Sequence, residues 1–486
     1  MAGAMLDLRP VAYVISLLVA ALGASMLFPL IVDLASGDPN ASAFSQSALI
    51  VVAVGALVAM ATSNSPRSHL STQQLVLITT GVWVALPVFG AVPFVFGATE
   101  ARYVDAFFEA MSGLTTTGAT VLSGLDELPR GLLYWRSMLQ WFGGVGIIVV
   151  AMVFLPELRV GGMQIFRSEA FDTGGKVLPR AAEIASRISV IYFGLTAACI
   201  FAYMGVGMSG FDAVNHALTT VATGGFSTHD ASFGHMQGAA EYVATVFMIL
   251  ASLPFVRFIQ LTSGNAGPLF RDSQVRVFIY VIAALVTFIF LIRVLVLDDA
   301  IERSLRETLF NVTSIITGTG YASVDYQLWG PLPLTILFFL GLIGGCAGST
   351  CCSIKIFRYQ LLFSSIAMQI RRIHTPHGVF QPRYEGRPVG GDVLSSVMAF
   401  FVIFVVSIGV TSVLLALTGL DFTTSLSGAV ASLANIGPGL GDVIGPSGNY
   451  APLNDAAKWI LAAAMLVGRL ELMAVFVLFL PRFWRG

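Results

Sequence analysis

Long apolar segments alternate with short polar connections along almost the whole chain. A hydrocarbon core of about 30 Å needs about 20 apolar residues in a helix. Segments of this length lie near residues 11–34, 47–63, 74–98, 131–156, 183–207, 239–262, 275–297, 331–366, 392–419 and 456–481. The pattern therefore predicts an all-α polytopic membrane protein with ten spans. The first segment is long and lacks a small-residue cleavage site, so we interpret it as an anchor.

Four shorter segments lie in the connections between these spans. They read DAFFEAMSGLTTTG (105–118), DAVNHALTTVATGG (212–225), ETLFNVTSIITGTG (307–320) and TSLSGAVASLANIG (424–437). The first three begin with a carboxylate, which suits a helix N-terminus, and Asp421 precedes the fourth. A helix of about ten residues is about 15 Å long, so each segment can enter a membrane but cannot cross it.

The four segments belong to an internal repeat of a span, a half-helix, a loop and a second span. Their final glycines follow one another at intervals of 107, 95 and 117 residues. Non-helical backbone at membrane depth is tolerated where it lines a watery cavity. The C-terminal end of a half-helix is negative, and carbonyl oxygens of the next loop can replace the hydration shell of a cation. The repeat therefore predicts a cation pathway.

Basic residues orient the predicted spans. Nearly all Lys and Arg residues fall at the termini or in even-numbered connections, and the seventh connection is ambiguous because Arg303 and Arg306 lie among acidic residues. The positive-inside rule then places both termini in the cytoplasm.

Composition excludes several other classes of protein. Of the 486 residues, 56% are hydrophobic and 11% are charged, which leaves too few charges for soluble domains. The net charge of -1 gives no signature of nucleic-acid binding, and no set of general base, nucleophile or metal ligand indicates an enzyme. The glycine-rich stretches neither follow a strand nor fit the spacing of a phosphate-binding loop.

Several motifs together resemble one family across the whole chain. They are LTTTGAT (114–120), LQWFGGVGII (139–148), VATGGFSTHD (221–230), TGTGY (317–321), GGCAGST (344–350), ANIGPGLG (434–441) and GRLE (468–471). The sequence resembles the TrkH subunits of bacterial Trk potassium-uptake systems, in the superfamily that includes the Ktr and HKT transporters. The resemblance implies K+ uptake across the bacterial inner membrane by a homodimer.

The resemblance also implies a domain organisation. It comprises four membrane-pore-membrane repeats, as in K+ channels, after two extra N-terminal helices. The predicted boundaries are 1–73 for the N-terminal region and 74–160, 177–265, 274–372 and 388–486 for repeats 1 to 4.

A potassium filter with one key glycine in each repeat follows from the resemblance. The expected glycines are Gly118, Gly225, Gly320 and Gly437. Gly224 and Gly318 are rivals, but the constant 13-residue offset from Asp105, Asp212 and Glu307 selects the later glycines. The backbone carbonyls expected to line the ion path below belong to Thr116, Thr117, Thr223, Gly224, Gly318, Thr319, Asn435 and Ile436. Glycine in all four positions is similar to the K+-selective members.

A predicted break in the eighth span is the candidate gate. Gly344, Gly345, Gly348, Ser349 and Thr350 are poor helix formers within an apolar segment. In TrkH-like proteins the corresponding loop, here 341–353, blocks the pore below the filter. The family usually continues with glycines, where this chain has Cys351, Cys352 and Ser353.

Arg469 lies in the tenth predicted span, where an ionisable residue indicates function. The resemblance places it beside the gate loop, where it would repel cations. The alternative is an ion pair with Glu471 or Glu109 that fixes helix packing.

The expected ligands and partners follow from the resemblance. This chain would bind K+ through filter carbonyls and no other cofactor. NAD(H), ATP or ADP would bind a cytosolic TrkA-type ring that docks on loops 157–182 and 367–390. Alternatives are an H+- or Na+-coupled symporter, a Na+-permeable relative, or a receptor that moves no ions. His229 and Asp230 form either a solvated pair or a coupling-ion site.

Overall fold

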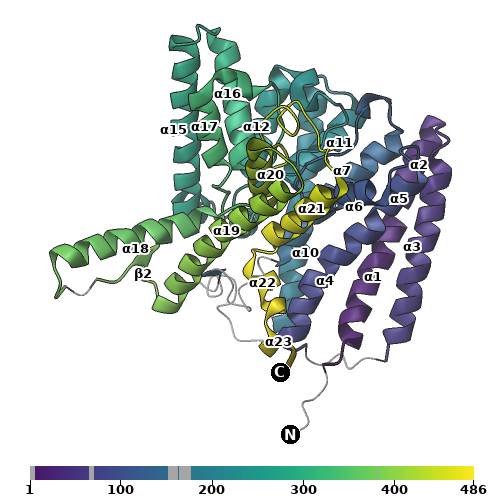
Figure 1. Ribbon diagram of the computed structural model, residues 1–486, viewed down its shortest axis with the longest axis horizontal. Coiled ribbons are helices and arrows are strands. Elements are labelled where there is room, and N and C mark those ends of the chain that lie inside the picture. The colour runs from purple at the N-terminus through teal and green to yellow at the C-terminus, as the bar shows by residue number, and fades with distance from the viewer. Residues whose placement is uncertain (1–5, 65–69, 151–161, 164–176, 379, 486) are drawn as a thin grey trace.

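The computed structural model describes residues 6–64, 70–150, 162–163, 177–378 and 380–485. These residues are mostly helical, as predicted. The exception is a short antiparallel pair, β1 (Arg383–Tyr384) and β2 (Arg387–Pro388). Long helices stand side by side, and the two chain termini lie at the same end of the molecule (Figure 1).

The helices follow one another with short connections. The first half contains α1 (Arg9–Ser25), α2 (Leu27–Ser36), α3 (Ala41–Thr62), α4 (Thr72–Gly90), α5 (Val92–Phe96), α6 (Tyr103–Leu114), α7 (Arg130–Val149), α10 (Val177–Gly205), α11 (Gly210–Val221) and α12 (Ala239–Ala251). The second half contains α13 (Phe255–Thr262), α14 (Gly267–Arg271), α15 (Ser273–Leu295), α16 (Ile301–Ile316), α17 (Pro331–Leu340), α18 (Ile356–His374), α19 (Gly391–Leu417), α20 (Phe422–Ala434), α21 (Asp455–Arg469), α22 (Met473–Phe476) and α23 (Pro481–Arg485). Single 3-10 turns are η1 (Leu125–Glu127), η4 (Ser232–Met236), η5 (Tyr326–Trp329) and η6 (Val477–Phe479).

The number of spans stays a prediction, because several predicted spans are bent, interrupted or only partly described. Within the described residues, six helices are long and apolar enough to cross a membrane, or up to eight if each of two bent pairs is one span. The predicted span 239–262 bends by 91° between α12 and α13. Pro254 causes this break because it cannot continue a helix. The span 456–481 bends by 107° after Arg469, where Glu471 and Leu472 both have positive φ.

Two other predicted spans are not single continuous helices. Segment 331–366 is non-helical between α17 and α18, where the sequence predicts a break. Segment 131–156 begins as α7, but part of it, together with the predicted end of repeat 1 at 160, lies outside the described residues. The predicted repeat boundaries therefore remain predictions.

Short helices are present where the sequence predicts half-helices, namely α6, α11, α16 and α20. Ser209 caps α11, and Asp421 caps α20 by accepting a hydrogen bond from the Thr424 backbone N–H at 3.1 Å. Glu307 was expected at a helix N-terminus, and this expectation is wrong because α16 begins at Ile301. Glu307 instead forms ion pairs with Arg293 and Arg303.

The short helices lie between longer neighbours. The helix α6 packs on α7, α11 on α7, α10 and α12, α16 on α15 and α12, and α20 on α19 and α21. The helix α21 also packs on α6, so the C-terminal part of the chain lies against the first short helix. The loops that follow α6, α11, α16 and α20, which we call the first to fourth loops, are thereby enclosed by helices.

Candidate ion pathway

The same backbone conformation recurs after each short helix. Gly118, Gly225, Gly320 and Gly437 have φ of 84°, 77°, 79° and 72°. The residues two positions earlier also have positive φ: Thr116 52°, Thr223 50°, Gly318 74° and Asn435 53°. Gly224 is not among the residues with positive φ, and Gly318 occupies the earlier position of the pattern.

Each of these glycines faces a carbonyl oxygen of another loop. A methyl group added to Gly118 would lie 2.2 Å from Gly224 O, and one on Gly225 would lie 1.9 Å from Thr319 O. The corresponding distances are 2.5 Å from Gly320 to Ile436 O and 2.9 Å from Gly437 to Thr117 O. The four contacts form a closed cycle, which we call the carbonyl ring. A side chain at any of its glycines would displace backbone, so only glycine fits.

A cavity of about 510 Å³ opens onto the carbonyl ring and is lined by all four glycines. Its walls also include Arg136, His229, Asp230 and Asp442. The structure therefore brings together the four glycines predicted from the repeat, in the lining of one cavity.

Helix α7 holds the second loop through two side chains that the sequence reasoning missed. Gln140 Nε2 donates to Gly224 O at 2.6 Å, and Gln140 Oε1 accepts from the Phe226 N–H at 3.0 Å. Arg136, one helical turn earlier, donates to Ser227 O at 2.7 Å and lies 4.2 Å from the centre of the Phe226 ring. For Arg136 the signal in the sequence was a charge within a predicted span, whereas Gln140 carries no comparable signal.

Arg136 also forms a fully buried ion pair with Glu109 of α6, at 2.8 Å. Glu109 accepts a second hydrogen bond from the Val121 N–H at 2.9 Å, and Arg136 contacts the Thr120 hydroxyl. The pair thus connects residues 120–121, which follow Gly118 in the first loop, with Ser227, which follows Gly225 in the second loop.

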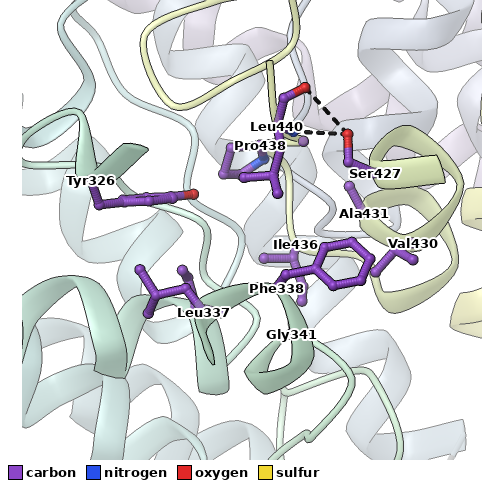
Figure 2. Close-up of a pocket in the computed structure, with 12 residues that line it drawn as sticks. Tyr326, Leu337, Phe338, Gly341, Ser427, Val430, Ala431, Ile436, Pro438 and Leu440 are labelled. Atoms are coloured by element: carbon purple, nitrogen blue, oxygen red, sulfur yellow. Dashed lines mark hydrogen bonds between the residues drawn. The ribbon is translucent and has the colours of Figure 1, made fainter. Parts of the chain in front are cut away.

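The fourth loop has different surroundings. Ser427 Oγ accepts from the Leu440 N–H at 2.9 Å and lies 3.3 Å from Leu440 O. Ile436 lines a small pocket of about 40 Å³ together with Leu337 and Phe338 of α17 and Val430 of α20, and the Phe338 ring lies beside Val430 (Figure 2). The fourth loop therefore has mainly apolar side chains beside Ile436, while the Tyr450 hydroxyl donates to Gly437 O at 2.7 Å.

The non-helical segment between α17 and α18 lies directly against the second and third loops. The Thr223 hydroxyl donates to the Thr350 hydroxyl at 3.1 Å, and Cys352 N lies 3.8 Å from a methyl group added to Gly318. Gly348 O accepts from the Phe255 N–H at 3.0 Å, and Cys346 N donates to Ser252 O at 3.1 Å. The break between α12 and α13 thus holds the segment in place.

Gly344 and Gly345 fit this segment because it is tightly folded. A methyl group on Gly344 would lie 2.0 Å from Cys352 O, and one on Gly345 would lie 2.8 Å from Cys351 Sγ. Ser349 donates to Cys346 O at 2.7 Å. All the predicted gate residues of the segment therefore lie in one compact loop.

Arg469 reaches the same loop. Its guanidinium donates to Thr350 O at 3.3 Å and to Gly143 O of α7 at 2.9 Å, and it also contacts Cys352 Sγ. The alternative ion pairs are wrong: Glu109 pairs with Arg136, and Glu471 pairs with Arg358 of α18. Within the described residues, Arg469 has no carboxylate partner.

His229 and Asp230 connect two loops at the rim of the cavity. His229 Nδ1 forms a hydrogen bond with Asp126, and Asp230 accepts from the Gly124 N–H at 2.9 Å. The hydrogen bond from His229 lowers the pKa of Asp126 below its usual value. His229 and Asp230 therefore connect the second loop with residues 124–126. A role of these two residues in ion coupling stays a prediction.

Comparison with known proteins identifies the family. The family described as "TrkH: Cation transport protein" matches residues 40–485. The chain belongs to the TrkH family. It is 42% identical to the Trk system potassium uptake protein TrkI of Halomonas elongata, over 98% of this chain and 97% of that protein. It is 37% identical to the Trk system potassium uptake protein TrkH of Escherichia coli, over 98% of this chain and 99% of that protein.

A solved structure agrees with this membership. The crystal structure of the potassium transporter TrkH from Vibrio parahaemolyticus matches with a TM-score of 0.91 and 34% identity, over 99% of this chain and 100% of that chain. This TrkH-family chain, with its apolar helices, is thus an integral membrane protein.

The buried Arg136–Glu109 pair of this TrkH-family chain yields a stability prediction. Arg136→Met leaves the Glu109 carboxylate buried without a counter-charge, so we expect the free energy of unfolding to fall by about 3–5 kcal/mol. Denaturant unfolding of the purified protein in detergent measures the change. Arg187→Met, which removes an exposed pair with Glu183, is the control and should cost at most about 1 kcal/mol. Equal losses in the two variants would contradict the interpretation.

Proposed function

We propose that this protein carries K+ across the bacterial inner membrane through the carbonyl ring. The observation that carries the proposal is the closed cycle of carbonyl oxygens and glycines from four sequence-related loops. Carbonyl oxygens can replace the hydration shell of an alkali cation. The names of the relatives, which are Trk system potassium uptake proteins, support K+ as the ion.

The chemistry of the surrounding residues suits a cation pathway. The oxygens proposed to line it are the backbone carbonyls of Thr116, Thr117, Thr223, Gly224, Gly318, Thr319, Asn435 and Ile436. Short helices end immediately before these loops, and their negative C-terminal ends favour a cation. Thr116 Oγ1 is buried and has no hydrogen-bond partner within the described residues, so it is a further oxygen that an ion could use.

The proposed gate is the segment 341–353 together with Arg469. Two features support it: the Thr223–Thr350 contact, which brings the segment against a ring loop, and the position of the Arg469 charge on Thr350. A fixed positive charge of low solvent exposure opposes the passage of a cation. Opening would require the segment and Arg469 to move away from the pathway.

Regulation would come from another protein. We propose that the chain forms a membrane homodimer with both termini in the cytoplasm. A cytosolic ring that binds NAD(H), ATP or ADP would dock on it. The exposed Arg371, Arg372, Arg383 and Arg387 on α18 and the adjoining hairpin support a docking surface in 367–390. Much of the second expected surface, 157–182, lies outside the described residues.

The selectivity of the ring is tested by Gly225→Ser. The added side chain meets Thr319 O and strains a residue with φ of 77°, so we expect the ratio of K+ to Na+ permeability to fall about tenfold, or about 1.4 kcal/mol. Flux of both ions into liposomes with the purified protein measures the ratio. Gly210→Ser is the control, because a methyl group there meets nothing within 4 Å. An unaltered ratio in Gly225→Ser would mean that the ring glycines are wrongly assigned.

The gate is tested by Arg469→Ala. A unit charge about 4 Å from an ion contributes about 4 kcal/mol at an effective dielectric constant of 20, so its loss should raise K+ leak through the closed protein at least about tenfold. Leak into liposomes without any partner protein measures this. Arg276→Ala, an exposed arginine, should leave the leak unchanged. Equal leak in Arg469→Ala and the unsubstituted protein would remove Arg469 from the gate.

A further inference from the structure

The four oxygens of the carbonyl ring differ in their hydrogen bonding. Gly224 O accepts a hydrogen bond from Gln140 Nε2 at 2.6 Å. In the part of the chain that the structure describes, no side chain donates to Thr117 O, Thr319 O or Ile436 O. The second loop is thus the one whose ring oxygen is held by a side chain.

Gln140 holds the second loop on both sides of Gly225. Its amide group donates to Gly224 O and accepts from the Phe226 N–H, as a neighbouring strand would in a sheet. Gln140 is fully buried, and a methyl group added to Gly224 would lie 2.4 Å from its side-chain amide. The side chain therefore lies flat against the loop, with both ends of the amide satisfied.

The fourth loop offers the contrast. Behind Ile436 the structure has the small apolar pocket between α17 and α20 (Figure 2). Within the described residues, Ile436 O accepts no side-chain hydrogen bond, and the Tyr450 hydroxyl donates instead to the next carbonyl, Gly437 O, at 2.7 Å. The carbonyl ring therefore combines one oxygen, Gly224 O, that a side-chain amide holds with three oxygens that no side chain of the described residues holds.

We propose that Gln140 is a positioning residue that sets the discrimination between K+ and Na+ by fixing the Gly224 carbonyl. The proposal rests on the proposed function of the ring. Na+ is smaller than K+, so it is well coordinated only if the ring oxygens move inward. An oxygen held from behind by an amide donor resists that movement, whereas a K+ ion leaves it in place.

Gln140→Met tests the proposal, because methionine has a similar length but cannot form either hydrogen bond. We expect the ratio of K+ to Na+ permeability to fall about fivefold, the factor that one hydrogen bond of ordinary net strength represents. K+ flux should be retained and Na+ flux should rise. Both fluxes are measured in liposomes with the full-length purified protein, and the thermal midpoint of each variant is recorded alongside.

Ser137→Ala is the matched control on the same helix. Ser137 is buried and donates only to Leu133 O of its own helix, at 3.2 Å, so this variant should keep the ratio. If Ser137→Ala changes the ratio as much as Gln140→Met does, the effect belongs to helix packing and the proposal is overturned.

A second variant covers the case in which Gln140→Met does not fold. Gln140→Glu keeps the acceptor for the Phe226 N–H but loses the amide donor to Gly224 O, so we expect it to lower the ratio as well. An unchanged ratio in the folded variants, with K+ flux intact, overturns the role of Gln140 and leaves the proposed function standing. Absence of K+ flux in the unsubstituted protein would instead overturn the proposed function.

Discussion

The close approach of a carbonyl oxygen to a glycine, repeated four times around a cycle, is the constraint on which the rest of the molecule depends. The carbonyl oxygen of each loop can approach the glycine of a neighbouring loop only because that glycine lacks a Cβ atom. The short helices must end just before these glycines, and their longer neighbours must enclose them. Polar backbone is thereby placed inside an apolar protein without exposure to lipid, the condition under which such backbone is tolerated.

Buried charges complete this arrangement, and they fall into two kinds. Arg136 with Glu109, and Arg358 with Glu471, are paired, and each pair connects elements distant in the sequence. Arg469 differs because backbone oxygens and a thiol surround it within the described residues. A buried charge without a carboxylate partner costs stability, and this cost motivates the proposal that Arg469 belongs to the gate.

The sequence predicted the parts of the fold that depend on local pattern. The half-helices, the positions of the four ring glycines and the break between α17 and α18 follow from spacing, from glycine and from the internal repeat. The helix class and the family were confirmed. The bends within the predicted spans 239–262 and 456–481 were not predicted, because hydropathy does not register a sharp bend at Pro254 or at Glu471.

The contacts of individual side chains could not be predicted in the same way. The alternative partners of Arg469 were inferred from proximity in the sequence or in the predicted topology, whereas the ion pairs form between α6 and α7 and between α18 and the bend after α21. Gln140 was missed because a glutamine in an apolar helix has no distinctive spacing. Its role depends on a loop more than 80 residues away.

The most direct test of the central claim is to locate a bound cation. Crystals of the protein grown in Rb+, a heavier ion that substitutes for K+, can be examined by anomalous diffraction. The account predicts an anomalous peak on the axis of the carbonyl ring, within coordination distance of Thr117 O, Gly224 O, Thr319 O and Ile436 O. Rb+ bound elsewhere in the protein, with no peak at the ring, would contradict it.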